Sequence, residues 1–122
     1  MNYEISQKFF FDAAHTLRRE IESDSSRRVH GHTYQAEVTV AGLPSGVTGM
    51  VVDLGLVRRE VALLRERLDH RMLDEVDGLG PPTLENLCQF IFKNLLPVLP
   101  ALTSVRVWRV SVGDGCRVTR PL

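Results

Sequence analysis

The chain has 122 residues, 43% of them hydrophobic and 25% charged, and its 15 basic and 15 acidic side chains cancel. These values fit one globular domain over residues 1–122, and the balanced charge gives no sign of a nucleic-acid or anionic-membrane partner. No apolar run is long enough to span a bilayer. The two cysteines, Cys88 and Cys116, have neither metal-ligand spacing nor a disulfide framework, and the first residues lack a signal-peptide pattern. We therefore expect reduced thiols and a cytoplasmic protein.

The first half of the chain predicts two long strands. Residues 3–14 form the first, and one of its faces carries Phe9, Phe11, Ala13 and then His15. Residues 16–28 are polar and charged and predict a loop. Residues 30–41 form the second strand, one face of which carries His30, His32, Tyr34, Ala36, Val38 and Val40. After a turn over residues 42–49, which contains Gly and Pro, residues 50–52 predict the end of a short strand.

The second half begins with two predicted helices. Asp53 can cap a helix that reaches about Leu68, and Thr83 can cap a second helix that is ended by Pro97 and Pro100. Apolar side chains recur at helical spacing in both: Val57, Val61, Leu64 and Leu68 in the first, and Leu84, Leu87, Cys88, Ile91 and Leu95 in the second.

The remaining segments complete the predicted fold class. Residues 69–82 predict a loop between the helices, residues 104–112 predict a strand, and a short strand or tail closes the chain. Runs of strands and runs of helices, rather than strict alternation, predict an α+β fold. Its antiparallel sheet should carry the helices on one face.

Histidines give the strongest functional signal. On a strand, His30 and His32 point to the same face, and Gly31 between them adds no bulk. With His15 from a neighbouring strand, three imidazoles would leave a fourth metal position open, as in a catalytic zinc site. A single histidine on an apolar strand is more often a hydrogen-bonded core residue or a surface residue. Zinc could also serve stability alone.

Five short motifs along the chain, in their order and spacing, are similar to those of one protein family. They are Phe11-Asp12-Ala13-Ala14-His15, His30-Gly31-His32-Thr33-Tyr34, Gly49-Met50-Val51-Val52-Asp53-Leu54, Leu68-Asp69-His70-Arg71-Met72-Leu73-Asp74 and Pro82-Thr83-Leu84-Glu85-Asn86. Through them, and through Gly115-Cys116, the chain resembles the 6-pyruvoyl-tetrahydropterin synthase and 6-carboxy-tetrahydropterin synthase family over nearly its whole length.

This resemblance implies the tunnelling fold, a four-stranded antiparallel sheet with two helices on one face. It also implies a homo-oligomer, commonly a hexamer made of two trimers, with active sites at subunit interfaces. The implied site residues are His15, His30 and His32 as ligands of Zn²⁺, Asp69 and His70 in proton transfer, and Thr83 and Glu85 near the substrate.

The chemistry implied by the family fits these residue types. Its substrates carry a hydroxylated side chain on a reduced pterin, and zinc as a Lewis acid would stabilise negative charge that develops beside a carbonyl. Histidine is the natural group for moving a proton near neutral pH. Asp69, in the same network, would hold the tautomer of His70. Without the histidine motif, Leu68-Asp69-His70 would be read as a surface helix end.

Two positions depart from the family pattern, and the first is that of the catalytic cysteine. Ser26 stands there, four residues before the His-Gly-His motif. A serine hydroxyl is a far poorer base than a thiol unless another group activates it. Glu20, Glu22 and Asp24 could supply a carboxylate base instead, although any one of them is more readily read as a solvated loop charge.

The second departure is in the last long strand, where the family carries a glutamate that anchors the pterin ring. Arg109 stands at this position, or Val110 if the count is taken back from Gly115. A guanidinium only donates hydrogen bonds, so it would face the donor edge of a pterin with like polarity and suits a carboxylate or phosphate instead. Arg109 could alternatively turn to solvent, or pair with Asp114 or with an acid on another subunit.

Together these features predict a zinc-dependent lyase or cyclase that acts by proton abstraction and elimination. Its substrate would be a small oxygenated molecule other than a pterin, and an anionic group would suit Arg109. One alternative is the ordinary 6-carboxy-tetrahydropterin synthase activity on dihydroneopterin triphosphate, as in queuosine synthesis. The other is a binding or structural ring that holds zinc without catalysis.

Overall fold

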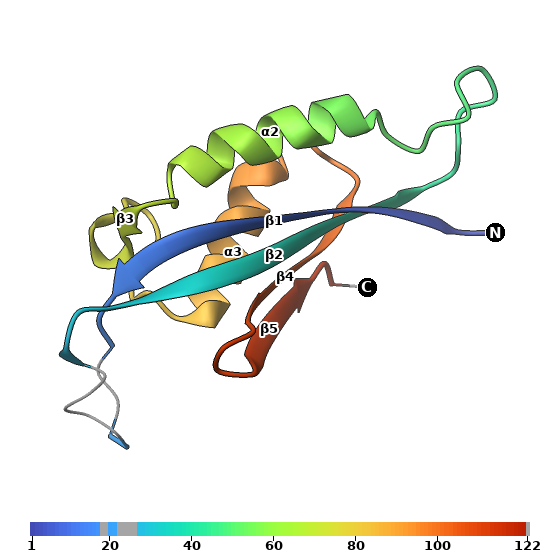
Figure 1. The fold of residues 1–122 in the computed structure, drawn as a ribbon. Coiled ribbons are helices and arrows are strands. Elements are labelled where there is room, and N and C mark those ends of the chain that lie inside the picture. Colours follow the sequence, from blue (N-terminus) through green and yellow to red (C-terminus); the bar gives the residue numbers. More distant parts are fainter. Residues whose placement is uncertain (18–19, 22–26, 122) are drawn as a thin grey trace.

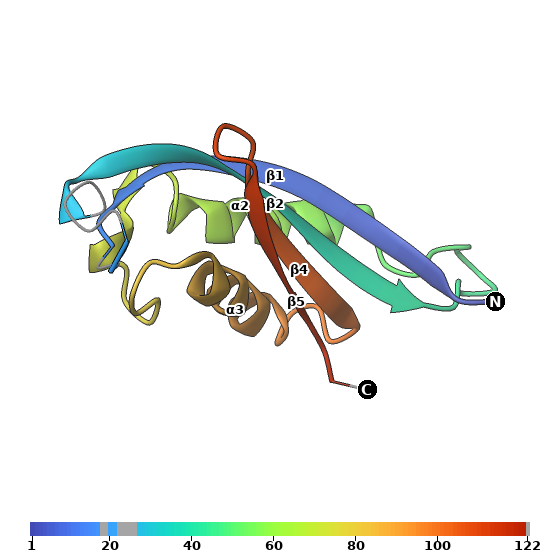
Figure 2. The ribbon, with the colours of Figure 1, turned by 90° about the horizontal axis from the view of Figure 1, so that it is seen from below.

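A curved sheet carries two helices on one face, as the computed structural model of residues 1–17, 20–21 and 27–121 shows (Figures 1 and 2). Its strands, in their order across the sheet, are β3 (Arg71–Met72), β1 (Tyr3–His15), β2 (His30–Gly42), β4 (Leu102–Arg109) and β5 (Asp114–Thr119). We call the face covered by the helices the helix-side face, and the other the open face. The prediction of an antiparallel sheet with both helices on one face is confirmed. The sheet has one more strand than the four expected, because the two-residue β3 (Arg71–Met72) pairs in parallel with the end of β1.

The two long strands form an unbroken ladder at the centre of the sheet. β1 (Tyr3–His15) pairs antiparallel with β2 (His30–Gly42) along its whole length, from Tyr3↔Gly42 to His15↔His30. Alternate residues are buried in the core under the helices from Phe11 onward in β1 and from Tyr34 to Val40 in β2. The aromatic rings of Phe11 and Tyr34 stack on this face with centroids 5.0 Å apart.

Both predicted helix caps are confirmed. The Asp53 carboxylate accepts a hydrogen bond from the Gly55 N–H at 2.8 Å at the start of α2 (Leu54–Glu66). The Thr83 hydroxyl accepts one from the Asn86 N–H at 3.1 Å at the start of α3 (Leu84–Leu95). The apolar stripe of each helix packs on the sheet. Neither of these helices is long and apolar enough to cross a membrane.

The last two strands form a hairpin, which moves the predicted boundaries. β4 (Leu102–Arg109) ends before Val110, which is 72% exposed in the turn, and β5 (Asp114–Thr119) returns antiparallel. The prediction of a strand up to residue 112 was therefore wrong, because valines of the turn look like strand residues. Gly115 lies opposite Trp108, where an added Cβ would come within 2.9 Å of the tryptophan Cβ.

Two connecting segments also differ from the prediction. Residues 50–52 are not a strand end: they follow a tight loop in which the Ser45 N–H donates to the Met50 carbonyl at 2.9 Å, and Met50 is half exposed. The predicted loop over residues 69–82 contains β3 and the short 3-10 helix η1 (Leu73–Glu75). It is attached to the sheet where the His70 N–H donates to the Asp12 carbonyl at 2.6 Å.

Candidate active site

Three histidines meet at one end of the helix-side face. The strand register pairs His15 with His30 and Ala13 with His32, so all three imidazoles lie on the same face. One ligand atom from each lies within 4.8 Å of the others. Within the described residues, this group contains no fourth histidine, cysteine or carboxylate. The juxtaposition expected from alternation along two strands is therefore present.

Backbone carbonyls fix the tautomers of two of these side chains. Nδ1 of His15 lies 3.1 Å from the Pro82 carbonyl oxygen, and Nδ1 of His30 lies 2.7 Å from the Arg28 carbonyl oxygen. Because a carbonyl only accepts, Nδ1 carries the proton and Nε2 keeps its lone pair. Nε2 of His15 is buried and has no hydrogen-bond partner among the described residues. A buried imidazole held by its other nitrogen is the arrangement that zinc ligands use, so the residues fit this metal.

The surroundings keep two of the three imidazoles, those of His15 and His32, uncharged. Burial, and next the nearby Arg109, lower the pKa of His32 to about 4. Burial also lowers the pKa of His15, against a smaller opposite effect of its bond to Pro82. Both side chains are therefore neutral near pH 7, which is the protonation state that binds a metal.

These lowered pKa values predict an acid-sensitive fold. Between about pH 6.5 and about pH 4, the unfolded chain takes up a proton on His32 that the folded chain does not, so stability falls as the pH is lowered through this window. We expect the variant His32→Asn to lose less stability than the wild type between pH 7 and pH 4.5. Urea denaturation with a chelator present measures this, and an equal acid loss in both proteins would contradict the prediction.

Arg109 is buried beside the histidines and bound to protein partners. Its Nε donates to Asp114 Oδ1 at 2.8 Å, its Nη2 donates to Asp114 Oδ2, and only 4% of its surface is exposed. Its Nη1 lies 3.2 Å from Nε2 of His32. Of the alternatives open from the sequence, the structure shows the pairing with Asp114. Of the two candidate positions, Arg109 and not Val110 faces the histidines.

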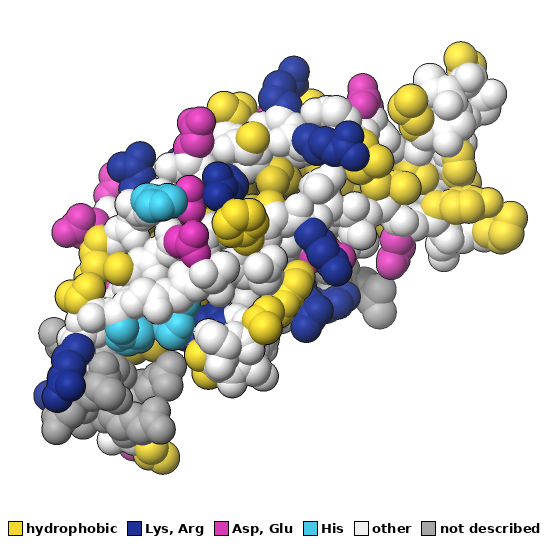
Figure 3. Space-filling view, in the orientation of Figure 1, with side chains coloured by type: hydrophobic (Ala, Val, Ile, Leu, Met, Phe, Trp, Pro, Cys, Tyr) yellow, Lys and Arg dark blue, Asp and Glu magenta, His cyan; other side chains and the backbone are white. Residues whose placement is uncertain are grey.

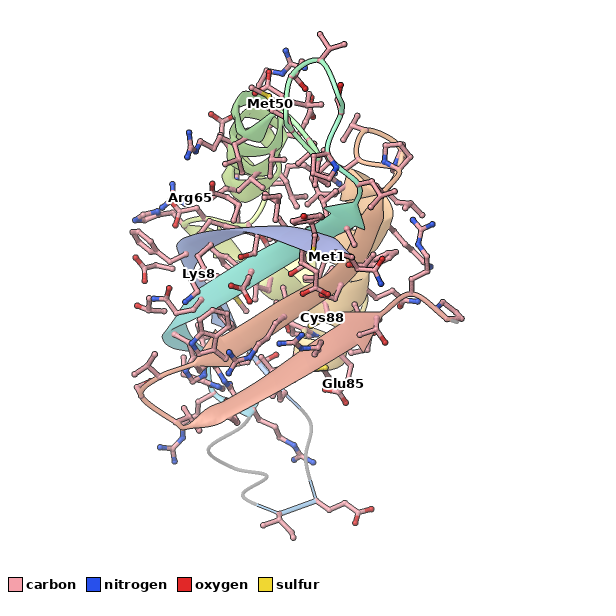
Figure 4. The ribbon with its side chains drawn as sticks, turned by 90° about the vertical axis from the view of Figure 1, so that its right-hand side faces the viewer. Met1, Lys8, Met50, Arg65, Glu85 and Cys88 are labelled. Carbon is pink, nitrogen blue, oxygen red and sulfur yellow. The ribbon has the colours of Figure 1, made fainter. Side chains whose placement is uncertain are left out.

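A cavity of about 340 Å³ opens next to the histidines. Its wall includes His15, Thr83, Glu85, Arg109 and Asp114, so the residues expected near a substrate do lie together. Glu85 lies at the start of α3 and is exposed (Figure 4). The hydroxyl of Thr83 is also the helix cap described above. The carboxylates that a ligand would meet here are those of Glu85 and Asp114.

Sequence reasoning missed two residues of this region as functional candidates. The Tyr34 hydroxyl lies 3.3 Å from Nδ1 of His15, and burial raises the pKa of Tyr34 to about 12, so the phenol stays protonated. Asp74 binds the segment after β1, because its carboxylate accepts from the Thr16 N–H at 2.9 Å and the Thr16 hydroxyl at 2.6 Å. Both residues belong to motifs through which the chain resembles its family, and this was the signal that could have identified them.

Asp69 and His70 form a second cluster, on the open face. Asp69 Oδ2 lies 2.9 Å from Nδ1 of His70 and 3.3 Å from an Arg65 nitrogen, while Asp69 Oδ1 accepts from the Asp12 N–H at 2.9 Å. The bond from Asp12 is the main cause that lowers the pKa of Asp69. The wall of a depression here includes Asp12, Thr33 and His70, and also His32 of the three histidines. Figure 3 shows histidine side chains in two separate patches, one of them beside acidic side chains.

Ser26 stands where the family carries its catalytic thiol. It lies outside the described residues, as do Glu22 and Asp24. Glu20, the remaining carboxylate of that segment, is exposed. The group that would replace the thiol therefore stays a prediction.

Comparison with known proteins gives consistent matches. A family model described as 6-pyruvoyl tetrahydropterin synthase matches residues 4–121. The chain is 35% identical over 109 residues to a 6-carboxy-5,6,7,8-tetrahydropterin synthase of Synechocystis sp., covering 84% of this chain and 83% of the relative. It is 31% identical over 115 residues to a dihydroneopterin monophosphate aldolase of Pyrococcus furiosus, covering 94% and 92%. The structure of 6-pyruvoyl tetrahydropterin synthase from Caenorhabditis elegans superposes with a TM-score of 0.83 and 25% identity, over 99% of this chain and 97% of that one.

Proposed function

The chain belongs to the 6-pyruvoyl tetrahydropterin synthase family, and on this basis we propose that it is a zinc-dependent lyase. It would remove a proton from a small oxygenated substrate and eliminate a leaving group. The observation that carries this proposal is the cluster of three imidazoles, in which the buried Nε2 of His15 has no partner among the described residues. A zinc ion held by His15, His30 and His32 would act as a Lewis acid on a substrate oxygen.

The proton would be moved by the Asp69–His70 pair. Asp69 is ionised and accepts from Nδ1–H of His70, which leaves Nε2 of His70 with its lone pair. The imidazole is 79% exposed, so a substrate can reach Nε2 without displacing protein atoms. Asp69 would also stabilise the imidazolium that forms when His70 takes up the proton.

A single chain keeps the proposed proton-transfer pair apart from the proposed metal ligands. The three histidines form one cluster on the helix-side face, whereas His70 clusters with Asp12 and Asp69 on the open face. Of the three histidines, only His32 also lines the depression that contains His70. We propose that the protein is a homo-oligomer, with a hexamer of two trimers as the expected form, and that His70 of one subunit serves the histidines of a neighbour. The separation of the two clusters within one chain supports an active site at a subunit interface rather than within one chain.

The substrate is proposed to differ from that of the ordinary activity. The family's thiol is replaced by Ser26, and the ring-anchoring glutamate by Arg109, which only donates hydrogen bonds. An anionic group of the substrate would have to compete with Asp114 for this guanidinium, because the two already form a bidentate pair.

Native mass spectrometry of the purified protein tests the proposal in one measurement. We expect about one zinc ion per chain, several subunits per particle and a retained small molecule, whose mass would identify the substrate class. Incubated in D₂O, that molecule should exchange a carbon-bound hydrogen with the wild type and not with the variant His70→Ala. Protein that takes up no zinc even when it is supplied, or an unchanged exchange in the variant, would refute the proposal.

One observation favours the ordinary pterin substrate as a second candidate. Asp114 lines the cavity with its side chain 41% exposed, and Arg109 lowers its pKa, so the carboxylate stays ionised. Each oxygen bound by Arg109 keeps a further lone pair. Asp114 could therefore accept the two parallel donors of a pterin's amino-amide edge in place of the family's glutamate.

This second candidate predicts that Asp114→Asn weakens pterin binding. Losing a charged acceptor should lower the affinity for neopterin about tenfold or more, followed by quenching of the pterin fluorescence. Asp77→Asn, at an exposed position in the loop after η1, is the matched control and should bind as the wild type does. If the wild type binds no neopterin, or Asp114→Asn binds it equally well, the second candidate is excluded.

A further inference from the structure

The contact between Arg109 and His32 has a consequence for the proposed metal site. Nη1 of the guanidinium lies 3.2 Å from Nε2 of the imidazole. Arginine can only donate, so Nε2 of His32 accepts with its lone pair and Nδ1 carries the proton. All three histidines of the cluster are then in the same tautomer, with Nε2 unprotonated.

Arg109 and a metal ion would compete for that lone pair. A nitrogen lone pair that accepts a hydrogen bond from Nη1 cannot at the same time coordinate a cation. Binding a metal through Nε2 of His32 therefore requires this contact to break. The positive charge of the guanidinium would also lie close to a divalent cation, and this repulsion is unfavourable in a partly buried site.

Asp114 holds Arg109 in place and offsets its charge. The pair is bidentate across the β4–β5 hairpin, and the guanidinium is almost fully buried. Arg109 therefore cannot readily turn to solvent when its contact with His32 is broken. Without the carboxylate, a buried and unpaired positive charge would face the three imidazoles.

We propose that Arg109 restrains cation binding at the three histidines and that Asp114 makes this binding possible by neutralising Arg109. This inference rests on the proposed function only in taking the three histidines as the metal site. It assigns a positioning role to a pair of residues that replaces, in this chain, the single carboxylate expected on β4.

Zinc affinity, measured by competition with a chromophoric chelator, tests the inference without any enzyme assay. We expect Arg109→Met, which keeps the unbranched stem of the side chain but not its charge or donors, to bind Zn²⁺ at least about tenfold more tightly than the wild type. Asp114→Asn should bind Zn²⁺ about 10–100-fold more weakly, as expected for loss of a group that supports the ligands. Arg106→Met is the matched control. Arg106 lies on the same strand but over the Trp108 ring, and its loss should leave the affinity unchanged.

A second measurement needs no variant to fold. The ¹⁵N chemical shifts of the imidazole nitrogens in the chelator-treated wild type should show His32 with its proton on Nδ1. A proton on Nε2 would overturn the inference, as would Arg109→Met binding Zn²⁺ no more tightly than the wild type. Equal, tight binding by all variants would refute the inference and leave the metal site standing. Absence of binding by every protein would refute the proposed function as well.

Discussion

Replacing His30 by alanine is expected to remove stoichiometric zinc from the protein. Its imidazole would supply one of the three proposed ligands, and the cluster contains no fourth histidine, cysteine or carboxylate among the described residues that could take its place. Losing one of three ligands should lower the zinc affinity at least about a hundredfold, because the binding free energy is spread over few bonds. Native mass spectrometry and chelator competition measure the loss.

His70→Ala is the matched control for this experiment. It removes the same chemical group at the same end of the sheet, but on the open face. The His70 variant should keep its zinc and lose the hydrogen exchange that the proposed function predicts, whereas the His30 variant should lose both. Zinc retained at wild-type affinity in the His30 variant would show that the three imidazoles are not the ligand set.

Replacing Phe11 by alanine is expected to cost about 3–5 kcal/mol of unfolding free energy, the usual range for a fully buried aromatic side chain. Phe11 is 0% exposed, and its ring stacks on Tyr34, whose hydroxyl lies against His15. The space left by the missing ring should therefore also loosen the support of the proposed metal site and weaken zinc binding. Urea denaturation gives the free energy of unfolding.

Phe10→Ala provides the comparison at the next position. Phe10 points to the open face, is 49% exposed and lies under the Arg65 guanidinium at 5.0 Å. Its loss should cost about 1 kcal/mol or less, as for an exposed cation–π contact. Similar losses for both variants would mean that the alternation of β1 does not decide which face is buried.

Much of the fold could be predicted because its signals are local. Alternation along the first two strands gave the face on which the histidines lie, and two polar caps before apolar stripes gave both helices. The three histidines meet because His15 ends one strand and His30 begins its partner, so only the pairing of adjacent strands was needed. The family expected from the motifs was confirmed by the match over residues 4–121.

The rest of the candidate site depends on the hairpin register, which the sequence does not specify. Arg109 meets Asp114 only because β4 ends at residue 109 and the turn brings the two residues opposite each other. Val110 and Val112 in that turn look like strand residues, so the predicted strand ran too far. The left-handed backbone at His70, with φ of 58°, is only weakly indicated by its residue type, because histidine adopts this conformation more often than most residues but still rarely. It places the imidazole at the end of β1 beside Asp12.

Most of β1 lies at an edge of the sheet, where its backbone groups have no partner strand within the described residues. Only Ala13 and Ala14 of β1 pair with β3. The Phe10 carbonyl accepts a hydrogen bond from the Arg65 side chain at 2.6 Å, so one more backbone group at this edge is satisfied. At the opposite border, β5 ends the sheet in the described part of the chain. Open borders attract further strands.

Because the strands already bend over the helices (Figure 2), copies joined border to border would each turn the assembly by the same angle. Such an assembly closes into a cylinder only if that angle divides a full turn, and otherwise it winds into an open filament. The bend of the strands would then set how many copies complete the circle, so a variant that flattens the sheet should change the stoichiometry before it changes the fold.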